Sequence, residues 1–239
     1  MKNKNFVWII FFGVILLLSA CTPKNQESEL EEGTQPDKVL NVMTHDSFSV
    51  SDDLITQFEA ENNVKINFLL SGDTGAALNR AILTKESPQA DIFFGVDNTF
   101  ISRALEEDIF EPYSSPLLNN VNDEFKIESN YVSPIDYGDV CINFDKAYFE
   151  NNNLEIPASF QDLLKPVYSG LLVVENPATS SPGLAFLLAT IAEFGEDGYI
   201  DFWEDLKSNE VVIVNDWETA YYTNFSASAG QGEQPMVVS

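Results

Sequence analysis

Cysteine and histidine are scarce in this chain, which has 239 residues but only two cysteines and one histidine. If Cys21 is modified, as argued below, Cys141 has no partner and the chain forms no internal disulfide. The single histidine, His45, leaves no zinc ligand set and no Ser-His-Asp or Cys-His arrangement that stands out. The sequence therefore predicts no metal site, no cofactor and no enzymatic activity. Cys141 lies in the apolar run 140–142, a pattern typical of a small buried hydrophobe in a strand.

Basic residues are also few, with 12 Lys and Arg against 38 Asp and Glu and a formal net charge of −26. Because phosphate binding depends on neutralisation by Lys and Arg, so acidic a chain is not expected to bind nucleic acid or anionic headgroups. A cationic ligand fits this charge, and so does an acidic surface that serves solubility alone. Charge does not choose between these two interpretations.

The N-terminal segment has the pattern of an export signal. Lys2 and Lys4 precede an uncharged run over 6–18, which is shorter than the roughly 20 apolar residues of a membrane span. Leu-Ser-Ala-Cys over 18–21 resembles the bacterial lipobox, so residues 1–20 are predicted to be a signal peptide and Cys21 the lipidated first residue of the mature protein. The alternative is a simple signal peptide with a chance cysteine.

Residues 21–38 are predicted to form a flexible acidic tether after the lipidated cysteine. From Thr22 to Lys38 the chain holds one leucine and no aromatic residue, so it cannot bury enough apolar surface to offset its ordering entropy. The expected location is the outer face of a bacterial membrane, at the cell surface or in the periplasm, with a lipid anchor.

Apolar periodicity predicts strands that alternate with helices, which is typical of an α/β fold with mostly parallel sheets covered by helices. We expect two lobes, 39–138 and 139–239, with 136–144 crossing between them. A helix that starts at Ser51 is expected to bury Leu54, Ile55 and Phe58. The predicted strands are 39–43, 65–70, 91–96, 140–144, 171–174 and 211–214, and the other predicted helices include 76–85, 160–164, 200–206 and 217–225.

Ligands bind at the carboxyl ends of the strands in such sheets, so the loops that follow the strands are candidate binding segments. The stretch "ENPATSSPGLAFLLATI" is one of them. Ser180 or Ser181 is predicted to cap a helix, with Pro182 in its first turn and Gly183 keeping that turn open. The stretch is either a plain helix start or a niche in which hydroxyls and free amides hold a ligand group.

Five segments in order, "MTHDSF", "GVDN", "DYG", "ENPATSSPGLAFLL" and "NDWETAY", resemble the thiamine-binding proteins of bacterial ABC importers. The resemblance covers 39–239 and implies the two-lobed type II periplasmic-binding-protein fold. It also implies a monomer that captures thiamine or a thiamine phosphate and delivers it to an ABC permease. Members of that family continue past the equivalent of "PMVVS" and return to the first lobe, so we expect that return to be missing here.

The resemblance also implies a ligand site. Trp217 and Tyr221, four residues apart on one helix face, match the family's Trp and Tyr, although a core aromatic pair would show the same spacing. Asp97 is either a carboxylate facing the ligand or a helix cap. Histidine stands at 45 where a tyrosine is expected. The proposed ligand-binding residues are His45, Asp46, Ser47, Asp73, Asp97, Asn98, Asp136, Tyr137, Ser180, Ser181, Gly183, Trp217 and Tyr221.

Three rival interpretations remain open. Ferric-ion binders of this fold use adjacent tyrosines, as in Tyr221-Tyr222, but those pairs normally follow a strand such as 236–238; polyamine or sulfate is a further possibility on the same fold. A thiamine-cleaving enzyme shares the fold and uses a cysteine near the lobe crossing, where Cys141 lies, but its flanking residues do not match. A surface lipoprotein for adhesion or display would bind no small ligand.

Overall fold

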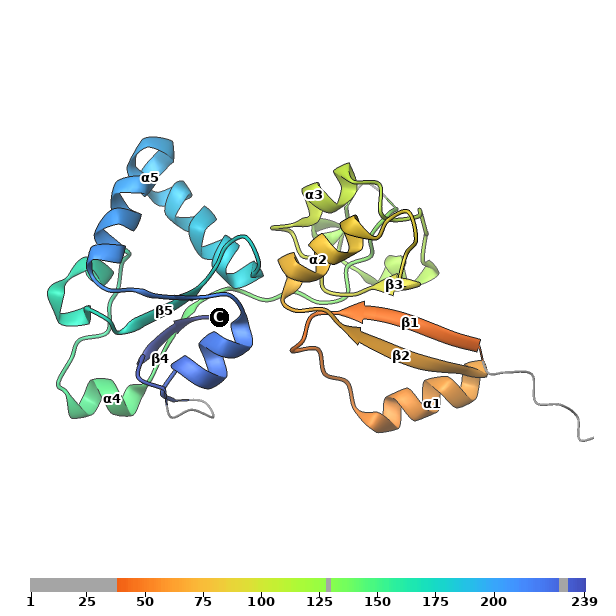
Figure 1. Ribbon diagram of the computed structural model, residues 1–239, viewed down its shortest axis with the longest axis horizontal. Helices are drawn as coiled ribbons and strands as arrows, with labels where there is room; N and C mark the ends of the chain where they lie inside the picture. Colours follow the sequence, from red (N-terminus) through yellow and green to blue (C-terminus); the bar gives the residue numbers. More distant parts are fainter. Residues whose placement is uncertain (1–37, 128–129, 228–231) are drawn as a thin grey trace, which may run out of the picture. The chain divides into compact units, whose positions relative to one another are not determined.

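The computed structural model describes residues 38–127, 130–227 and 232–239 (Figure 1). The predicted signal peptide, Cys21 and the tether up to residue 37 lie outside this part of the chain. Among the described residues, no helix combines the length and the apolarity needed to cross a membrane.

The first sheet has three parallel strands in the order β2-β1-β3: β1 Lys38–Thr44, β2 Val64–Leu70 and β3 Ile92–Phe93. The strand predicted over 91–96 is shorter in the structure because the chain turns away at Gly95, where φ is 113°. Three α-helices belong to this half of the chain: α1 Asp52–Asn62, α2 Thr74–Leu83 and α3 Ile101–Glu106. Two short 3₁₀ turns follow, Pro116–Asn120 and Asp123–Phe125.

The second sheet has four strands in the order β4-β7-β5-β6: β4 Ile142–Phe144, β5 Leu172–Glu175, β6 Val212–Val214 and β7 Met236–Val238. Strand β5 runs parallel to both of its neighbours, whereas β4 is antiparallel to β7. Helix α4 covers Lys146–Asn151, and 3₁₀ turns cover Gln161–Leu164 and Pro166–Tyr168. Helix α5, Ser181–Ser208, is broken at Gly195, and a π-helical segment covers Thr219–Asn224.

The largest hydrophobic core lies on one face of the second sheet. Leu172 and Val174 of β5 and Met236 and Val238 of β7 point into it, because alternate residues of a strand face the same side. Helix α5 covers this face with apolar side chains from both of its halves. The other buried members are Phe149, Leu163, Tyr168, Phe186, Phe202 and Leu206.

The predicted burial of one face of α1 is wrong for the described residues. Leu54 is 59% exposed and Phe58 is 43% exposed, and no residue of α1 is buried. Helix α1 packs mainly on β2, the outer strand of a narrow sheet. Amphipathic periodicity is present in the sequence, but only a small part of that apolar face is covered here.

Asp145 joins the start of α4 to the segment that follows the π-helix. Its Oδ1 accepts from the amide of Tyr148 at 3.2 Å, and its Oδ2 accepts from the Ser226 hydroxyl at 2.6 Å. The Ser226 hydrogen bond is the main cause that lowers the pKa of this carboxyl. Replacement of Asp145 by alanine should lower the free energy of unfolding by about 1–2 kcal/mol, a cost typical of a lost helix cap. Chemical denaturation measures this, and Asp145→Asn, which keeps an acceptor oxygen, should lose less.

Candidate functional site

Loops that follow β1 and β2 of the first sheet and β6 of the second line one small cavity, which we call the acidic pocket. Asp46 and Ser47 follow β1, Asp73 follows β2, and Asp216, Trp217 and Glu218 follow β6. Each of these segments lies at the carboxyl end of its strand, the edge at which ligands bind in such sheets. Four of the six lining residues carry a carboxylate, and one is a tryptophan.

Asp73 holds this arrangement together through both of its carboxylate oxygens. Its Oδ1 accepts from the amide of Thr74 at 2.8 Å and caps α2, and its Oδ2 accepts from the amide of Trp217 at 3.1 Å. The amide of Gly75 donates to the carbonyl of Thr179 at 2.9 Å, which ties the start of α2 to the loop after β5. Two hydrogen bonds therefore join the start of α2 to the loops that follow β5 and β6.

Three aromatic side chains cluster where the helix after β6 widens into π-helical turns. Trp217 stacks on Tyr221 with ring centroids 4.9 Å apart and planes 17° apart, and Tyr222 meets Trp217 edge-on at 5.3 Å. The indole Nε1 of Trp217 donates to the Ser239 hydroxyl at 2.8 Å. Tyr221 thus covers one face of the indole, so a ligand in the acidic pocket can contact the other face or the edge. Segments of π-helix recur at functional sites in proteins.

The start of α5 differs from the capped helix that the sequence predicts. Ser180 occupies the cap position and Pro182 the first turn, but the Ser180 side chain makes no capping hydrogen bond. The hydroxyls of Ser180 and Ser181 are buried, and neither has a hydrogen-bond partner among the described residues. The expected cap is therefore wrong in its chemistry, and two hydroxyls lie unpaired beside the helix amides that carry partial positive charge.

Gly183 lets the first turn of α5 lie directly on the end of β5. A Cβ atom at this position would lie 2.3 Å from the carbonyl oxygen of Glu175 and 3.1 Å from the Glu175 Cβ. Both distances are below normal contact, so only glycine fits. The close approach places Glu175 beside the turn that carries Ser180 and Ser181.

Glu175 is a site residue that the sequence analysis missed. It is 0% exposed, and neither of its carboxylate oxygens has a hydrogen-bond partner among the described residues. Burial raises the pKa of this carboxyl to about 8, and the negative charges of Asp73 and Asp216 add to the effect. An acid at the end of the apolar strand sequence "LLVVE" was the available signal, because the last residue of a fully buried strand is placed at the ligand edge.

The remaining predicted residues fall into two groups. His45 lies next to the pocket: its Nδ1 is 2.9 Å from the Ser47 hydroxyl, and its ring lies against Phe94. Asp97, Asn98, Asp136 and Tyr137 do not line the acidic pocket. Asp97 instead caps the turn before α3 by accepting from the amide and hydroxyl of Thr99 at 2.9 and 2.6 Å.

Residues 136–141 of the segment predicted to cross between the lobes are solvent-exposed, whereas 142–144 form the half-buried strand β4. Tyr137 is 80% exposed and stacks on Phe125 with ring centroids 4.8 Å apart, and Asp136 is exposed too. Cys141 is also exposed, so its predicted burial is wrong. It lies one residue before β4, its backbone pairs with Ser239, and strand alternation turns its side chain to the face opposite Ile142, which packs against the core. Within the described ranges, no group of three or more His, Cys, Asp or Glu residues is placed to hold a metal ion.

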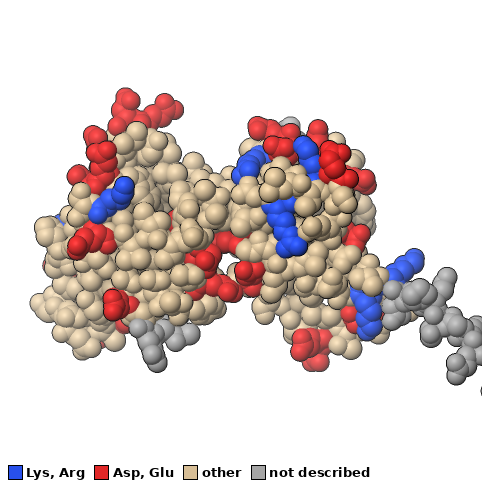
Figure 2. All heavy atoms as spheres, viewed as in Figure 1, with Lys and Arg blue, Asp and Glu red and all other residues tan. Residues whose placement is uncertain are grey.

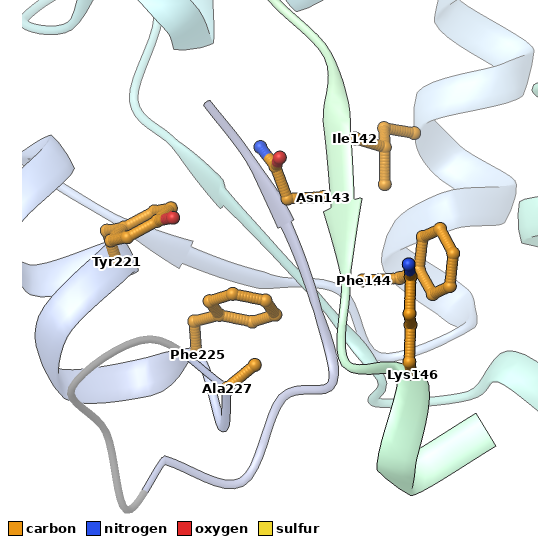
Figure 3. A pocket seen from close by; sticks show the side chains of 7 residues that line it. All are labelled: Ile142, Asn143, Phe144, Lys146, Tyr221, Phe225 and Ala227. Atoms are coloured by element: carbon orange, nitrogen blue, oxygen red, sulfur yellow. The ribbon is translucent and has the colours of Figure 1, made fainter. Parts of the chain in front are cut away.

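A second pocket, of about 390 Å³, lies at the edge strand β4 and has a different character. Figure 3 shows Asn143, Tyr221 and Phe225 on one side of the sheet, while Ile142 and Phe144 point to the other. Lys146 at the start of α4 gives this pocket a positive charge, so it does not suit a cationic ligand. Tyr221 lines this pocket and stacks on Trp217 of the acidic pocket.

Acidic side chains outnumber basic ones on the face shown in Figure 2, in keeping with the net charge of −26. The four carboxylates of the acidic pocket are part of this excess. Asp73 and Asp216 are half-buried, so water screens their charges less than it screens those of surface acids. A cation between them is therefore attracted more strongly than a cation between exposed carboxylates.

Comparisons with known proteins show which sequences the chain is similar to. Residues 87–220 match the sequence profile of a family described as bacterial extracellular solute-binding protein. A thiamine-binding periplasmic protein of Brucella suis is 28% identical over 215 residues, which cover 88% of this chain and 61% of the relative. The chain thus spans about three fifths of the length of that curated relative.

Solved structures show the same two-lobed type II periplasmic-binding-protein fold. A periplasmic thiamin binding protein superposes with a TM-score of 0.67 at 25% identity, over 84% of this chain and 61% of that one. The apo ferric ion-binding protein A of Pasteurella haemolytica superposes with a TM-score of 0.54 at 21% identity, over 72% of this chain and 53% of that one. The second likeness shows the fold alone, and the α/β fold expected from the sequence is confirmed.

Proposed function

The chain belongs to the bacterial extracellular solute-binding proteins, and we propose that it captures thiamine or a thiamine phosphate and delivers it to an ABC permease. The observation that carries this proposal is the acidic pocket, which carboxylates from both halves of the chain line together with Trp217. The likeness to thiamine-binding relatives supports the same ligand.

The chemistry of thiamine suits the side chains of the acidic pocket, whose volume of about 10 Å³ must widen to admit the ligand. Its thiazolium ring is permanently cationic, so it favours nearby carboxylates such as Asp73 and Asp216 when water is displaced. A cation against the face of a tryptophan gains roughly 0.5–2 kcal/mol, and Trp217 supplies that face. No catalytic group is required for this role, and we propose binding and transport rather than an enzymatic reaction.

The start of α5 supplies a second contact in this proposal. The hydroxyls of Ser180 and Ser181 have no hydrogen-bond partner among the described residues, and Gly183 lets this turn pack directly against the backbone of Glu175. Hydroxyl groups and free amides at a helix N-terminus suit the hydroxyethyl arm of thiamine or the phosphate of its esters.

Delivery requires a closed state that the ligand favours. The hydrogen bonds Asp73–Trp217 and Gly75–Thr179 join the two halves beside the acidic pocket and are candidates for contacts of that state. We place the bending residues at Asp136, Tyr137 and Gly138, which are exposed and lie between the sheets in sequence. We further propose lipidation at Cys21, an extracytoplasmic location on the membrane surface, and a monomeric binding protein.

Isothermal titration of the full-length protein with thiamine, thiamine monophosphate, ferric citrate and spermidine tests the ligand. We expect saturable heat with thiamine or its phosphate and none with ferric citrate. A red or purple protein with iron would favour ferric binding through Tyr221 and Tyr222. Heat with none of the four ligands would favour a lipoprotein for adhesion or display. Turnover of thiamine that stops when Cys141 is alkylated would reveal an enzyme.

Replacement of Trp217 by alanine should weaken thiamine binding by about 10- to 30-fold, the factor that corresponds to a loss of about 1.4–2 kcal/mol. Trp217→Phe retains an aromatic face and should lose less. The same titration on Tyr113→Ala, which removes an aromatic ring that is 66% exposed and does not line the pocket, serves as the control. Equal affinities for wild type and Trp217→Ala would rule out contact between the indole and the ligand.

A further inference from the structure

Glu175 has neither of the arrangements that normally accompany a buried carboxyl. Buried acids are usually paired with a cation or hydrogen-bonded, because an isolated charge is costly to remove from water. Glu175 is 0% exposed, and its two oxygens have no partner among the described residues. In the ligand-free protein at neutral pH this carboxyl therefore holds a proton.

The charged groups around Glu175 are all acids. Asp73, from the start of α2, and Asp216, from the loop after β6, act on it electrostatically, and both line the acidic pocket. The neighbouring strands β6 and β7 and the first turn of α5 contribute no charged side chain. The only titratable side chains of the π-helix are its two tyrosines. The backbone amide of Glu175 itself lowers the pKa of this carboxyl, and the helix amides at the start of α5 carry partial positive charge that acts in the same sense, but burial outweighs both.

We propose that Glu175 exchanges its proton for the ligand's charge: a cationic ligand that binds between Asp73 and Asp216 displaces the proton held by Glu175. The proposal rests on the proposed function for the identity of the cation. A cation in the pocket offsets the two aspartates and adds a direct attraction for an ionised Glu175. Both effects favour loss of the proton, and Glu175 then acts as a further carboxylate of the binding site.

The step balances without any other reactant. The O–H bond of the Glu175 carboxyl breaks, its electron pair stays on the carboxylate, and the proton passes to the buffer through water that enters with the ligand. Because coupling between two binding events is reciprocal, deprotonation of Glu175 must strengthen ligand binding by the same factor. Affinity therefore rises with pH, by up to about tenfold per pH unit, as long as the free protein holds the proton. The rise should end above about pH 8.

The test is a pair of thiamine titrations at pH 7 in two buffers with different heats of protonation. The difference in the binding heat gives the number of protons released, and we expect between one half and one per ligand for the wild type. Glu175→Gln mimics the protonated carboxyl and should release none, with an affinity that no longer changes between pH 6.5 and 8.5. Glu218→Gln is the matched control, because Glu218 lines the same pocket but is exposed; it should still release the proton.

The outcomes separate this proposal from the proposed ligand. Thiamine that binds the wild type without proton release, or with the same release in Glu175→Gln, overturns the role of Glu175 and leaves thiamine binding intact. If thiamine gives no heat, the proposed ligand is wrong, and the same pair of titrations with spermidine decides whether a cation displaces the proton. Absence of binding by both cations overturns the proposal together with the function on which it rests.

Discussion

Replacing Glu175 with glutamine is expected to make the protein more stable than the wild type at pH 8 and to have little effect near pH 4.5. The pKa of this carboxyl is about 8 in the folded protein and near 4.5 in the unfolded chain. Between these values the folded state holds a proton that the unfolded state has lost, so the free energy of unfolding falls as pH rises. The fall is about 1.4 kcal/mol per pH unit for a single group.

The measurement is denaturation by urea at a series of pH values, with the free energy of unfolding of Glu175→Gln compared with that of the wild type. Other carboxyls titrate in the same range, but they contribute equally to both proteins and cancel in the difference. Glu150→Gln, at an exposed position of α4, serves as the control and should follow the wild-type curve. Parallel curves for Glu175→Gln and the wild type would show that Glu175 ionises normally in the folded protein.

Replacing Gly183 with alanine is expected to lower the free energy of unfolding by about 3 kcal/mol and to weaken ligand binding. The added Cβ would lie 2.3 Å from the Glu175 carbonyl oxygen and 2.7 Å from the carbonyl carbon. Because these are backbone atoms, no change of rotamer relieves the contact, and the start of α5 must move. That movement would displace Ser180 and Ser181 from their positions in the turn that packs on Glu175.

Gly198→Ala is the matched control because it makes the same change within the same helix. Its nearest neighbour would be the Cβ of Phe194 at 3.3 Å, a side-chain contact that small shifts relieve. Alanine has a higher helix propensity than glycine by about 1 kcal/mol, so this variant should lie within about 1 kcal/mol of the wild type. If Gly183→Ala is as stable as Gly198→Ala and binds ligand equally well, the close approach of α5 to Glu175 does not hold the site together.

Most strands were predictable from the sequence because their apolar runs are short, rich in valine and isoleucine, and bounded by polar turns. The same reasoning failed where burial depends on neighbours distant in sequence. Leu54 and Phe58 have the spacing of a buried helix face. Whether their side chains are buried depends on which elements pack against α1, and the local sequence does not show this. Cys141 lies in an apolar run, but its side chain is exposed because strand alternation turns it away from the core face on which Ile142 and Phe144 pack.

The candidate site was predictable as a set of loops but not as a set of contacts. Asp46, Ser47, Asp73 and Trp217 meet in one pocket because their loops follow parallel strands, which the sequence pattern indicates. Two features depend on tertiary packing alone: the unpaired Ser180 hydroxyl and the buried Glu175. A helix-start sequence predicts a capping bond, and the run "LLVVE" places Glu175 at the ligand edge of the sheet without showing that its side chain turns inward rather than to water.

A crystal structure of the full-length protein with thiamine tests the central claim most directly. We expect the thiazolium ring in the acidic pocket, against Trp217 and between the carboxylates of Asp73 and Asp216, with the hydroxyethyl arm at the start of α5. Thiamine bound instead in the pocket beside Lys146, or a cleft that excludes thiamine and holds ferric iron on Tyr221 and Tyr222, would contradict the account.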